Sequence, residues 1–305
     1  MNGFLNILKP PGMTSAAVVG NVRRLTGEKR VGHAGTLDPE AAGVLPVMVG
    51  RAARLFDYLT EKEKTYVAEC AFGCETDTQD AQGAVTRTGD AYPTLDAVKA
   101  ATQSLTGDIL QRPSAYSAVK RDGKALYELA RAGRSVEIEP RPVHIERIDV
   151  GPETENHGVM LTVTCGRGTY IRALCEDIGR LCGCPAHMRF LLRTRTGVFD
   201  IADAVTLEEA AEAAAQGRLD ELLTPMDAPL GHLPRLEVPE AWYKPAFNGV
   251  SLPVEAFGAQ ELPEAENALV RLYAGEVFLG LASRHGETMT WRVILADHKD
   301  MESCR

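Results

Sequence analysis

The chain has 305 residues, which is enough for one large domain and a second, small one. Its composition, 45% hydrophobic and 25% charged, is that of a soluble globular protein, and no apolar run approaches the roughly 20 residues that span a bilayer. The seven cysteines are odd in number and scattered, and the first residues carry no secretory signal. These features predict a reduced, cytoplasmic protein without a disulfide framework or a membrane segment.

The net charge of −9 is unevenly distributed. Residues 1–199 carry 25 Lys and Arg against 23 Asp and Glu, whereas residues 200–305 carry 8 against 19. Two stretches are basic, 110–147 (8 against 5) and 164–195 (6 against 2). A local basic surface attracts phosphates whatever the overall charge, so nucleic-acid binding is not excluded. On charge alone, an unevenly charged solvated surface is the simpler interpretation.

The elements of the first part follow from apolar periodicity and turn residues. Residues 3–8 predict a strand that ends at a Pro-Pro-Gly turn. Thr14 is a candidate N-cap for a helix whose apolar residues recur at helical spacing as far as Gly27. Next we expect a Gly-rich loop at 32–39, a strand at 44–49, a helix at 52–59 and a strand at 65–72.

The remaining elements mix helices and strands without a regular βαβ rhythm, which favours an α+β fold over a doubly wound sheet. Expected helices lie at 95–105, 125–132, 170–181 and 207–216, and expected strands at 143–150 and 159–165. A Pro-punctuated segment at 225–240 predicts a domain boundary. Beyond it, the segments 269–281 and 290–295 are typical of a small β-rich domain.

Common cofactor and metal motifs are absent from the sequence. It contains neither a Gly-x-Gly-x-x-Gly motif after a strand nor a Walker-type phosphate loop. The acidic run at 77–83 resembles a calcium loop, but Gln79 and Ala81 occupy ligand positions. Cys182 and Cys184 lack metal-ligand spacing. We therefore expect no cofactor and no metal.

Several polar residues have ordinary structural interpretations when each is taken alone. Asp38 precedes a proline, a pattern typical of a helix start. Tyr66 could be a core or edge aromatic on a strand. Tyr170 and Arg172 could belong to a helix N-terminus with a surface arginine. No single one of these residues defines a site.

Their combination resembles the TruB family of tRNA pseudouridine-55 synthases, from Phe4 to about Met226. The matching blocks, in the family's order, are LNILKPPGMTS (5–15), VGHAGTLDP (31–39), GVLP (43–46), KTY (64–66), TDTQDAQG (76–83), QRPSAYSAVK (111–120) and GTYIR (168–172). The C-terminal third matches only loosely. Leu192 is a departure, because the family frequently has arginine there, and the neighbouring Arg193 is a candidate to supply that contact.

The resemblance implies a role for each matching residue. Asp38 corresponds to the catalytic aspartate, Arg172 to the arginine that pairs with it, and Tyr66 to the tyrosine that stacks on the target base. The other implied residues are Tyr170 and Leu191 as pocket walls, His33 as a substrate contact, and Asp80 and Lys120 as supporting residues.

The resemblance also implies the architecture and the partner. We expect a pseudouridine synthase fold with a mixed, mostly antiparallel sheet over 1–231, an RNA-gripping insertion at about 110–147, and a PUA-like domain over 232–305. The implied substrate is the T-stem-loop of tRNA, bound by a monomer without an obligatory protein partner.

Three alternative functions would make different demands on the sequence. A non-catalytic RNA-binding protein would not need Asp38, Tyr66 and Arg172 together. A relative that works with guide RNA would usually carry long basic extensions, which this chain lacks. A hydrolase using Asp38 as phosphoryl acceptor is excluded, because the partner acids that would bind magnesium are not at hand.

Overall fold

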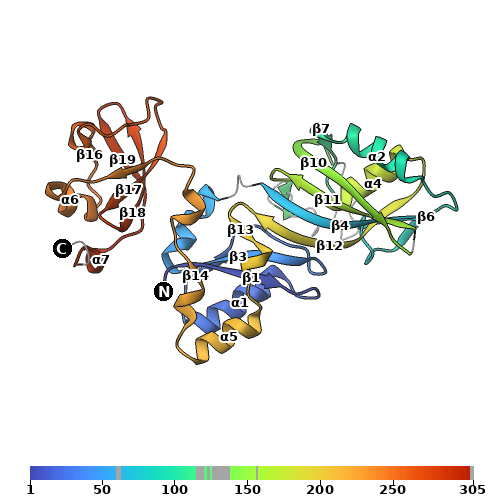
Figure 1. Cartoon of the computed structure of the whole chain (residues 1–305), viewed down its shortest axis with the longest axis horizontal. Helices are drawn as coiled ribbons and strands as arrows, with labels where there is room; N and C mark the ends of the chain where they lie inside the picture. The colour runs from blue at the N-terminus through green and yellow to red at the C-terminus, as the bar shows by residue number, and fades with distance from the viewer. Residues whose placement is uncertain (60–62, 115–119, 122–123, 126–137, 156, 303–305) are drawn as a thin grey trace.

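The computed structural model describes residues 1–59, 63–114, 120–121, 124–125, 138–155 and 157–302. Most strands belong to two sheets, which Figure 1 shows in two lobes. The N-terminal lobe ends with the last strand of the large sheet, β14 (Leu223–Thr224), and the C-terminal lobe begins with β15 (Arg235–Glu237). Among the described residues, no helix is long and apolar enough to cross a membrane.

The large sheet has ten strands, with the order β14-β1-β3-β12-β4-β11-β10-β7 along its main path. Its members besides β14 are β1 (Gly3–Lys9), β2 (Val31–His33), β3 (Ala42–Val49), β4 (Lys64–Phe72), β7 (Gly107–Gln111), β10 (Arg141–Glu153), β11 (Gly158–Cys165), β12 (Ala186–Thr196) and β13 (Phe199–Asp200). Neighbouring strands of this described sheet are antiparallel except β3 and β12, which are parallel. The expectation of an α+β fold with a mixed, mostly antiparallel sheet is confirmed.

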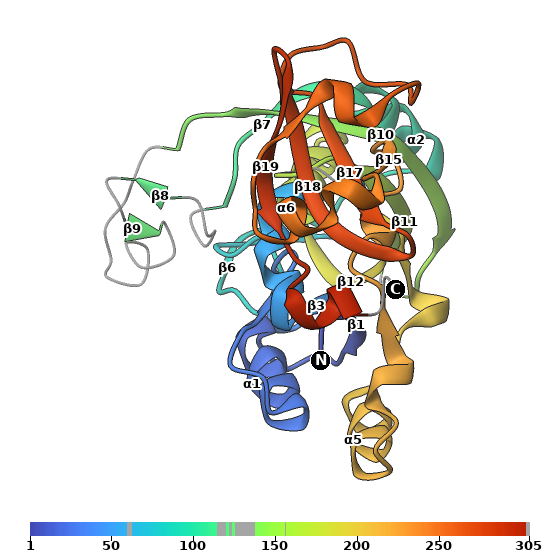
Figure 2. The same ribbon diagram turned by 90° about the vertical axis from the view of Figure 1, so that its left-hand side faces the viewer.

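Helices cover the two ends of this sheet (Figures 1 and 2). Near β1 and β3 lie α1 (Ser15–Thr26) and α5 (Leu207–Ala215), and near β4, β10 and β12 lie α2 (Leu95–Ser104) and α4 (Ile171–Leu181). Helix α1 has the predicted ends: the Thr14 hydroxyl accepts a hydrogen bond from the Ala17 N–H at 3.1 Å, and Gly27 follows with φ of 65°. The main hydrophobic core lies between the sheet and these helices.

Two helix predictions differ from the structure or fall outside it. The segment predicted at 52–59 is helical but forms a 3₁₀ helix, η1 (Gly50–Tyr58), whose first turn is held by Asn2, because its side chain accepts from the Arg51 N–H at 2.8 Å. The helix predicted at 125–132 lies outside the described residues, apart from Ala125 in the short strand β9 (Lys124–Ala125).

The central strand β12 is not predicted by the sequence pattern. Its apolar residues are interrupted by Arg189, Arg193 and Arg195, so the sequence pattern indicates a polar segment instead of a buried strand. In the structure, Arg193 is fully buried and Leu191 nearly so. Tertiary packing therefore sets this strand, and it places both side chains next to β3 and β4.

The C-terminal lobe has its own five-stranded sheet and core. Its strands besides β15 are β16 (Leu252–Pro253), β17 (Leu269–Ala274), β18 (Val277–His285) and β19 (Thr288–Ile294). The predicted segment 269–281 contains a turn at Gly275, where φ is 56°, and so spans β17 and the start of β18. A PUA-like domain over 232–305 stays a prediction.

The remaining described elements are short. They are β5 (Cys74–Thr76), β6 (Val85–Thr88), β8 (Lys120–Arg121), α6 (Tyr243–Phe247), α7 (His298–Glu302) and the 3₁₀ turns η2 (Ile201–Asp203), η3 (Leu219–Leu222), η4 (Ala228–Leu230), η5 (Glu240–Trp242) and η6 (Val254–Phe257).

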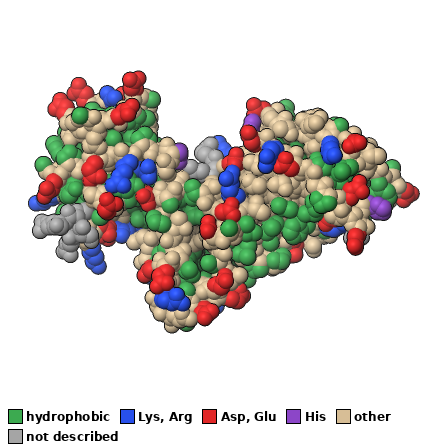
Figure 3. Space-filling view, viewed as in Figure 1, with side chains coloured by type: hydrophobic (Ala, Val, Ile, Leu, Met, Phe, Trp, Pro, Cys, Tyr) green, Lys and Arg blue, Asp and Glu red, His purple; other side chains and the backbone are tan. Residues whose placement is uncertain are grey.

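The two lobes share a third hydrophobic cluster. Leu281, Val293 and Leu295 of the C-terminal lobe are buried against Phe4 and Leu55 of the N-terminal lobe. Acidic side chains gather on the outer edge of the C-terminal lobe and around α5 on the face shown in Figure 3, in keeping with the acidity of residues 200–305.

Candidate active site

Asp38 lies in the segment that joins β2 to β3, here called the Asp38 loop (residues 34–41). The Ala41 N–H donates to the Asp38 carbonyl at 3.1 Å, which closes a turn, and β3 begins at the next residue. No helix follows Asp38, so the interpretation of Asp38 as an ordinary helix start is wrong.

Buried polar side chains from three distant elements hold this loop. The Ser15 hydroxyl donates to the Leu37 carbonyl and accepts from the Leu37 N–H, both at 3.0 Å. Arg193 donates to the carbonyls of Gly35 and Thr36 at 3.4 Å each. The loop is therefore fixed by hydrogen bonds to its backbone, which leaves the Asp38 side chain free to face the site.

Lys9, at the end of β1, is the third of these groups. It is fully buried, and its ammonium donates to the carbonyls of Pro39, at 2.8 Å, and Met13, at 2.5 Å. Burial lowers the pKa of Lys9 to about 8, although the nearby Glu40 and Asp38 oppose this shift. The sequence pattern did not single out Lys9; the available signal was a lysine that ends an apolar strand just before Pro-Pro-Gly.

Arg172 binds the Asp38 carboxylate. Its side chain is buried in the first turn of α4, and its Nε lies 3.0 Å from Asp38 Oδ2. The same guanidinium donates to the Thr78 carbonyl at 3.1 Å and pairs with Asp80 Oδ2 at 3.4 Å. The interpretation of Arg172 as a surface residue is wrong, and Asp80 lies where a supporting acid is expected.

Burial raises the pKa of Asp38 above its ordinary value. The charge of Arg172 acts in the opposite direction, while the carboxylate of Asp80 adds to the rise. The pKa of Asp38 is raised overall, because burial outweighs the ion pair with Arg172.

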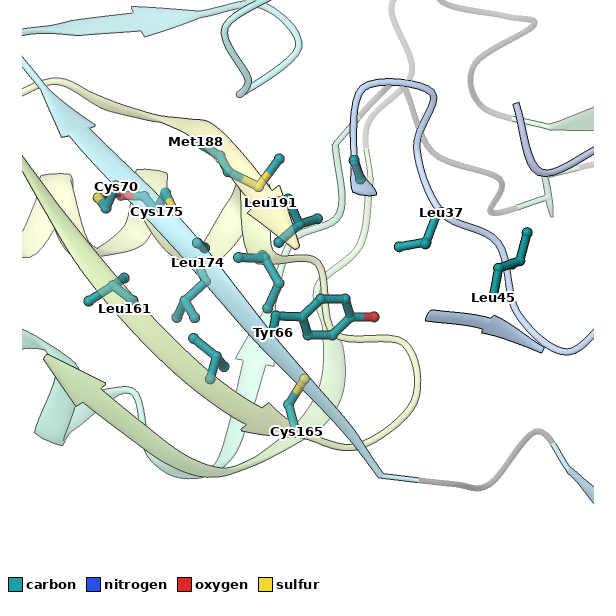
Figure 4. Close-up of a cluster of buried hydrophobic side chains, with 14 of the residues drawn as sticks. Leu37, Leu45, Tyr66, Cys70, Leu161, Cys165, Leu174, Cys175, Met188 and Leu191 are labelled. Atoms are coloured by element: carbon teal, nitrogen blue, oxygen red, sulfur yellow. Dashed lines mark hydrogen bonds between the residues drawn. The ribbon is translucent and has the colours of Figure 1, made fainter. Parts of the chain in front are cut away.

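A cavity of about 320 Å³ opens beside Asp38 and Arg172. Tyr66 on β4, Leu191 on β12 and Tyr170 at the start of α4 line it, so the structure brings these three predicted residues together with the ion pair. Figure 4 shows the Tyr66 ring directed from β4 toward the loop segment that carries Leu37. The cavity thus has an aromatic face, an apolar wall and a charged mouth.

Arg193 also lines this cavity, whereas Leu192 does not. The Nε of Arg193 donates to the Val44 carbonyl at 2.8 Å. Burial raises the pKa of the Tyr66 hydroxyl, and the charge of Arg193 and its hydrogen bond to that hydroxyl oppose the rise. Arg193 thus makes a pocket contact beside the position where the family frequently has arginine.

Two residue predictions fall elsewhere. His33, at the end of β2, lines a neighbouring groove rather than the cavity that holds Asp38. Burial lowers its pKa, and the charge of Arg193 lowers it further, so its imidazole is neutral at neutral pH. The side chain of Lys120 lies outside the described residues, so its supporting role stays a prediction.

Gln111 is a positioning residue that the sequence pattern did not single out. It is almost fully buried, and its side chain accepts from the Tyr170 N–H at 2.8 Å and donates to the Tyr170 carbonyl at 3.1 Å. This pair of bonds fixes the backbone at the start of α4, two residues before Arg172. A glutamine that is buried in this way can be recognised from the sequence only when the segment that it contacts is known.

Comparison with known proteins places the chain among pseudouridine synthases. A family described as "TruB family pseudouridylate synthase (N terminal domain)" matches residues 23–171, and one described as "tRNA pseudouridylate synthase B C-terminal domain" matches residues 172–231. The curated tRNA pseudouridine synthase B of Moorella thermoacetica is 45% identical over 302 residues, covering 97% of this chain and 98% of the relative. That of Heliobacterium modesticaldum is 47% identical over 245 residues, covering 79% and 78%.

A solved structure agrees with this placement. The chain matched in the Cbf5-Nop10-Gar1 complex has a TM-score of 0.76 and 26% sequence identity, with 97% of this chain and 86% of that chain covered. The mixed sheet and the two family matches define the class, a pseudouridine synthase. Within that class, the chain belongs to the TruB family of pseudouridylate synthases.

Proposed function

We propose that the protein converts uridine 55 in the T-loop of tRNA to pseudouridine, with Asp38 as the nucleophile. The observation that carries the proposal is the Asp38 carboxylate, held 3.0 Å from the buried Arg172 at the mouth of a cavity walled by Tyr66 and Leu191. Relatives of 45% and 47% identity that carry the name tRNA pseudouridine synthase B support the substrate class.

The isomerisation of uridine to pseudouridine requires few kinds of catalytic side chain. The N1–C1′ bond breaks, the uracil turns, a C5–C1′ bond forms, C5 loses a proton and N1 gains one, so nothing is oxidised or hydrolysed. Asp38 can attack C1′ or C6, or remove the proton at C2′, and each route requires an ionised, aimed carboxylate. Arg172 aims it through Nε, while Thr78 and Asp80 fix the other side of the guanidinium.

The cavity keeps the detached base in place. Uracil must leave its stack in the T-loop, at a cost of about a few kcal/mol, and stacking on Tyr66 offsets that cost. Leu191, on the neighbouring strand β12, adds an apolar contact to the same cavity. A base held against these side chains can turn without escaping into solvent.

The basic stretches 110–147 and 164–195 contact the phosphates of the RNA in this proposal, with Lys120 and Lys124 within the first of them. The protein acts in the cytoplasm as a monomer, without a cofactor, a metal or an obligatory partner. A non-catalytic RNA-binding role is the alternative. It gives no reason for an ion pair to be aimed into an aromatic cavity.

The substitution Asp38→Asn tests the proposal, because it keeps the side chain's shape and removes its charge. We expect single-turnover pseudouridine formation in unmodified tRNA, measured in excess chelator, to fall below detection. Filter binding of the same tRNA should change little, since phosphate and T-loop contacts set affinity. Residual activity within about tenfold of the wild type would show that Asp38 is not the nucleophile.

A further inference from the structure

A groove on the side of the molecule formed by α1 and β2 is not used by the proposed mechanism. It has a volume of about 690 Å³ and lies between α1, β2 and η1. We call it the α1–β2 groove and define it by Arg23, Lys29, Arg30, His33, Met48 and Phe56.

The charged side chains that line this groove are all cationic. Arg23, Lys29 and Arg30 line it, all three exposed, and no Asp or Glu is among the described residues that line it. The one acid in the sequence between Arg23 and His33 is Glu28, which binds the N-terminal ammonium at 3.0 Å. Two other surface pockets of comparable size are lined by both acidic and basic side chains. The α1–β2 groove differs from them because the charged side chains among its described lining residues are all cationic.

The cations of this groove are available to a ligand. Neither Lys29 nor Arg30 forms an ion pair within the described part of the chain, and Arg23 donates only to the Val31 carbonyl, at 3.3 Å. Cationic side chains with this exposure attract phosphates, and each phosphate contact releases counterions from the nucleic acid.

An exposed aromatic residue adds a second kind of contact. Phe56 on η1 is 43% exposed, which is unusual for so large an apolar side chain, and Met48 lies beside it in the groove lining. Cationic side chains beside an exposed aromatic face are the features with which proteins hold single-stranded nucleotides, by phosphate contact and base stacking.

The groove and the Asp38 cavity share no lining residue, but the chain connects them directly. His33 lines the groove, and the Asp38 loop begins at the next position. An RNA strand that follows the Asp38 loop from the cavity past His33 would reach the groove. Figure 2 shows α1 on the same side of the molecule as the short pair β8 and β9, within the basic stretch 110–147.

We propose that the α1–β2 groove binds the RNA strand next to the target uridine, with Lys29 and Arg30 on its phosphates and Phe56 stacked on a base. This inference rests on the proposed function, because it assigns a further segment of the same substrate.

The double substitution Lys29→Gln/Arg30→Gln tests the phosphate contacts. Binding of an unmodified T-arm stem-loop RNA would be measured by filter binding over a range of salt concentrations. We expect Kd and KM to rise about tenfold, kcat at saturating RNA to stay unchanged, and the salt slope of log K to fall by about 2, close to one unit per lost contact. Phe56→Ala should raise Kd without changing the slope.

Arg24→Gln is the matched control, because Arg24 is exposed on α1, which borders the groove, but does not line the groove. It should leave Kd within about twofold and the salt slope unchanged. A double variant that behaves like this control would overturn the groove assignment. Absence of pseudouridine in the wild-type reaction would instead contradict the proposed function, while the salt slopes would still decide whether the groove binds RNA.

Discussion

At the scale of single residues, the Asp38 loop depends on buried polar contacts that the loop does not itself supply. Ser15 is 3% exposed and makes both of its hydrogen bonds to Leu37, the residue before Asp38. An unsatisfied buried backbone group costs about 1–3 kcal/mol. The position of the carboxylate is therefore sensitive to side chains that never touch the substrate.

Ser15→Ala should lower kcat without a comparable change in tRNA affinity, because the loop would shift while the phosphate contacts remain. We also expect a loss of about 1–3 kcal/mol in the free energy of unfolding, measured by urea denaturation. Ser104→Ala is the control, since Ser104 is exposed and donates only to the Ala101 carbonyl. Equal effects of the two substitutions on kcat would contradict the proposed loop restraint.

The raised pKa of Asp38 predicts how activity depends on pH. Only the ionised carboxylate can act, so single-turnover rates should fall on the acid side with a midpoint above 3.8, the ordinary value for this group. RNA binding measured over the same pH range separates this effect from weaker association. A rate that stays constant down to about pH 4 would show that burial does not raise this pKa.

The same shift makes a prediction about stability. The pKa of Asp38 is higher in the folded than in the unfolded protein. The contribution of Asp38 to the free energy of unfolding is therefore present at acid pH, and it is lost as the pH rises through the pKa of the folded state. At neutral pH, Asp38→Asn should therefore give a Tm no lower than that of the wild type, measured by circular dichroism. A clear drop would mean that the ion pair with Arg172 outweighs burial.

At the scale of elements, the parallel contact of β3 with β12 requires a glycine. Gly43 has φ of 115°, and a Cβ built on it would lie 2.1 Å from the Arg193 carbonyl oxygen. Any side chain there would separate the two strands, which carry the Asp38 loop and Arg193. The glycine thus joins the two halves of the site.

Gly43→Ala should destabilise the protein by at least about 2 kcal/mol in urea denaturation, because strain and collision act together. Gly27→Ala has the strain without the collision: Gly27 has φ of 65°, and its Cβ would meet no atom within 4 Å. That control should lose roughly 1 kcal/mol. Similar losses for both variants would argue against the close approach of β3 and β12.

Sequence patterns located the elements with clear periodicity and missed those set by packing. Helix α1 is specified by Thr14, its apolar spacing and Gly27, all local signals. Strand β12 has no such signal, since its buried Arg193 looks like a surface residue until the backbone carbonyls around it are known. For the same reason the resemblance identified Asp38, Tyr66 and Arg172, whereas Lys9 and Gln111 emerged only from their contacts.

At the scale of the whole molecule, an apolar contact and an ion pair both link the two lobes. Leu281, Val293 and Leu295 are buried between them, and Arg51 pairs with Asp300 at 2.6 Å and Asp297 at 3.4 Å. The ion pair is partly exposed, and such pairs contribute about 0–1 kcal/mol. The apolar cluster should therefore dominate the attachment.

Leu281→Ala should lower the free energy of unfolding by about 2–5 kcal/mol, and Arg51→Ala by at most about 1 kcal/mol. Limited proteolysis of the segment 225–240 would report the attachment directly, with faster cleavage expected for Leu281→Ala. A larger effect of Arg51→Ala in both measurements would reverse this order.

The distance along the chain between Asp38 and Arg193 has a consequence during synthesis. A ribosome adds about 5–20 residues per second, so these two residues emerge roughly eight to thirty seconds apart. In that interval the nascent chain holds β1, α1 and β3 but lacks the strand that joins β3 to β4. Lys9 and Ser15 can already hold the Asp38 loop by then, but its carboxylate has no arginine partner until α4 is made. A nascent chain shorter than about 200 residues should therefore be unable to form the site, however much of its own fold it has acquired.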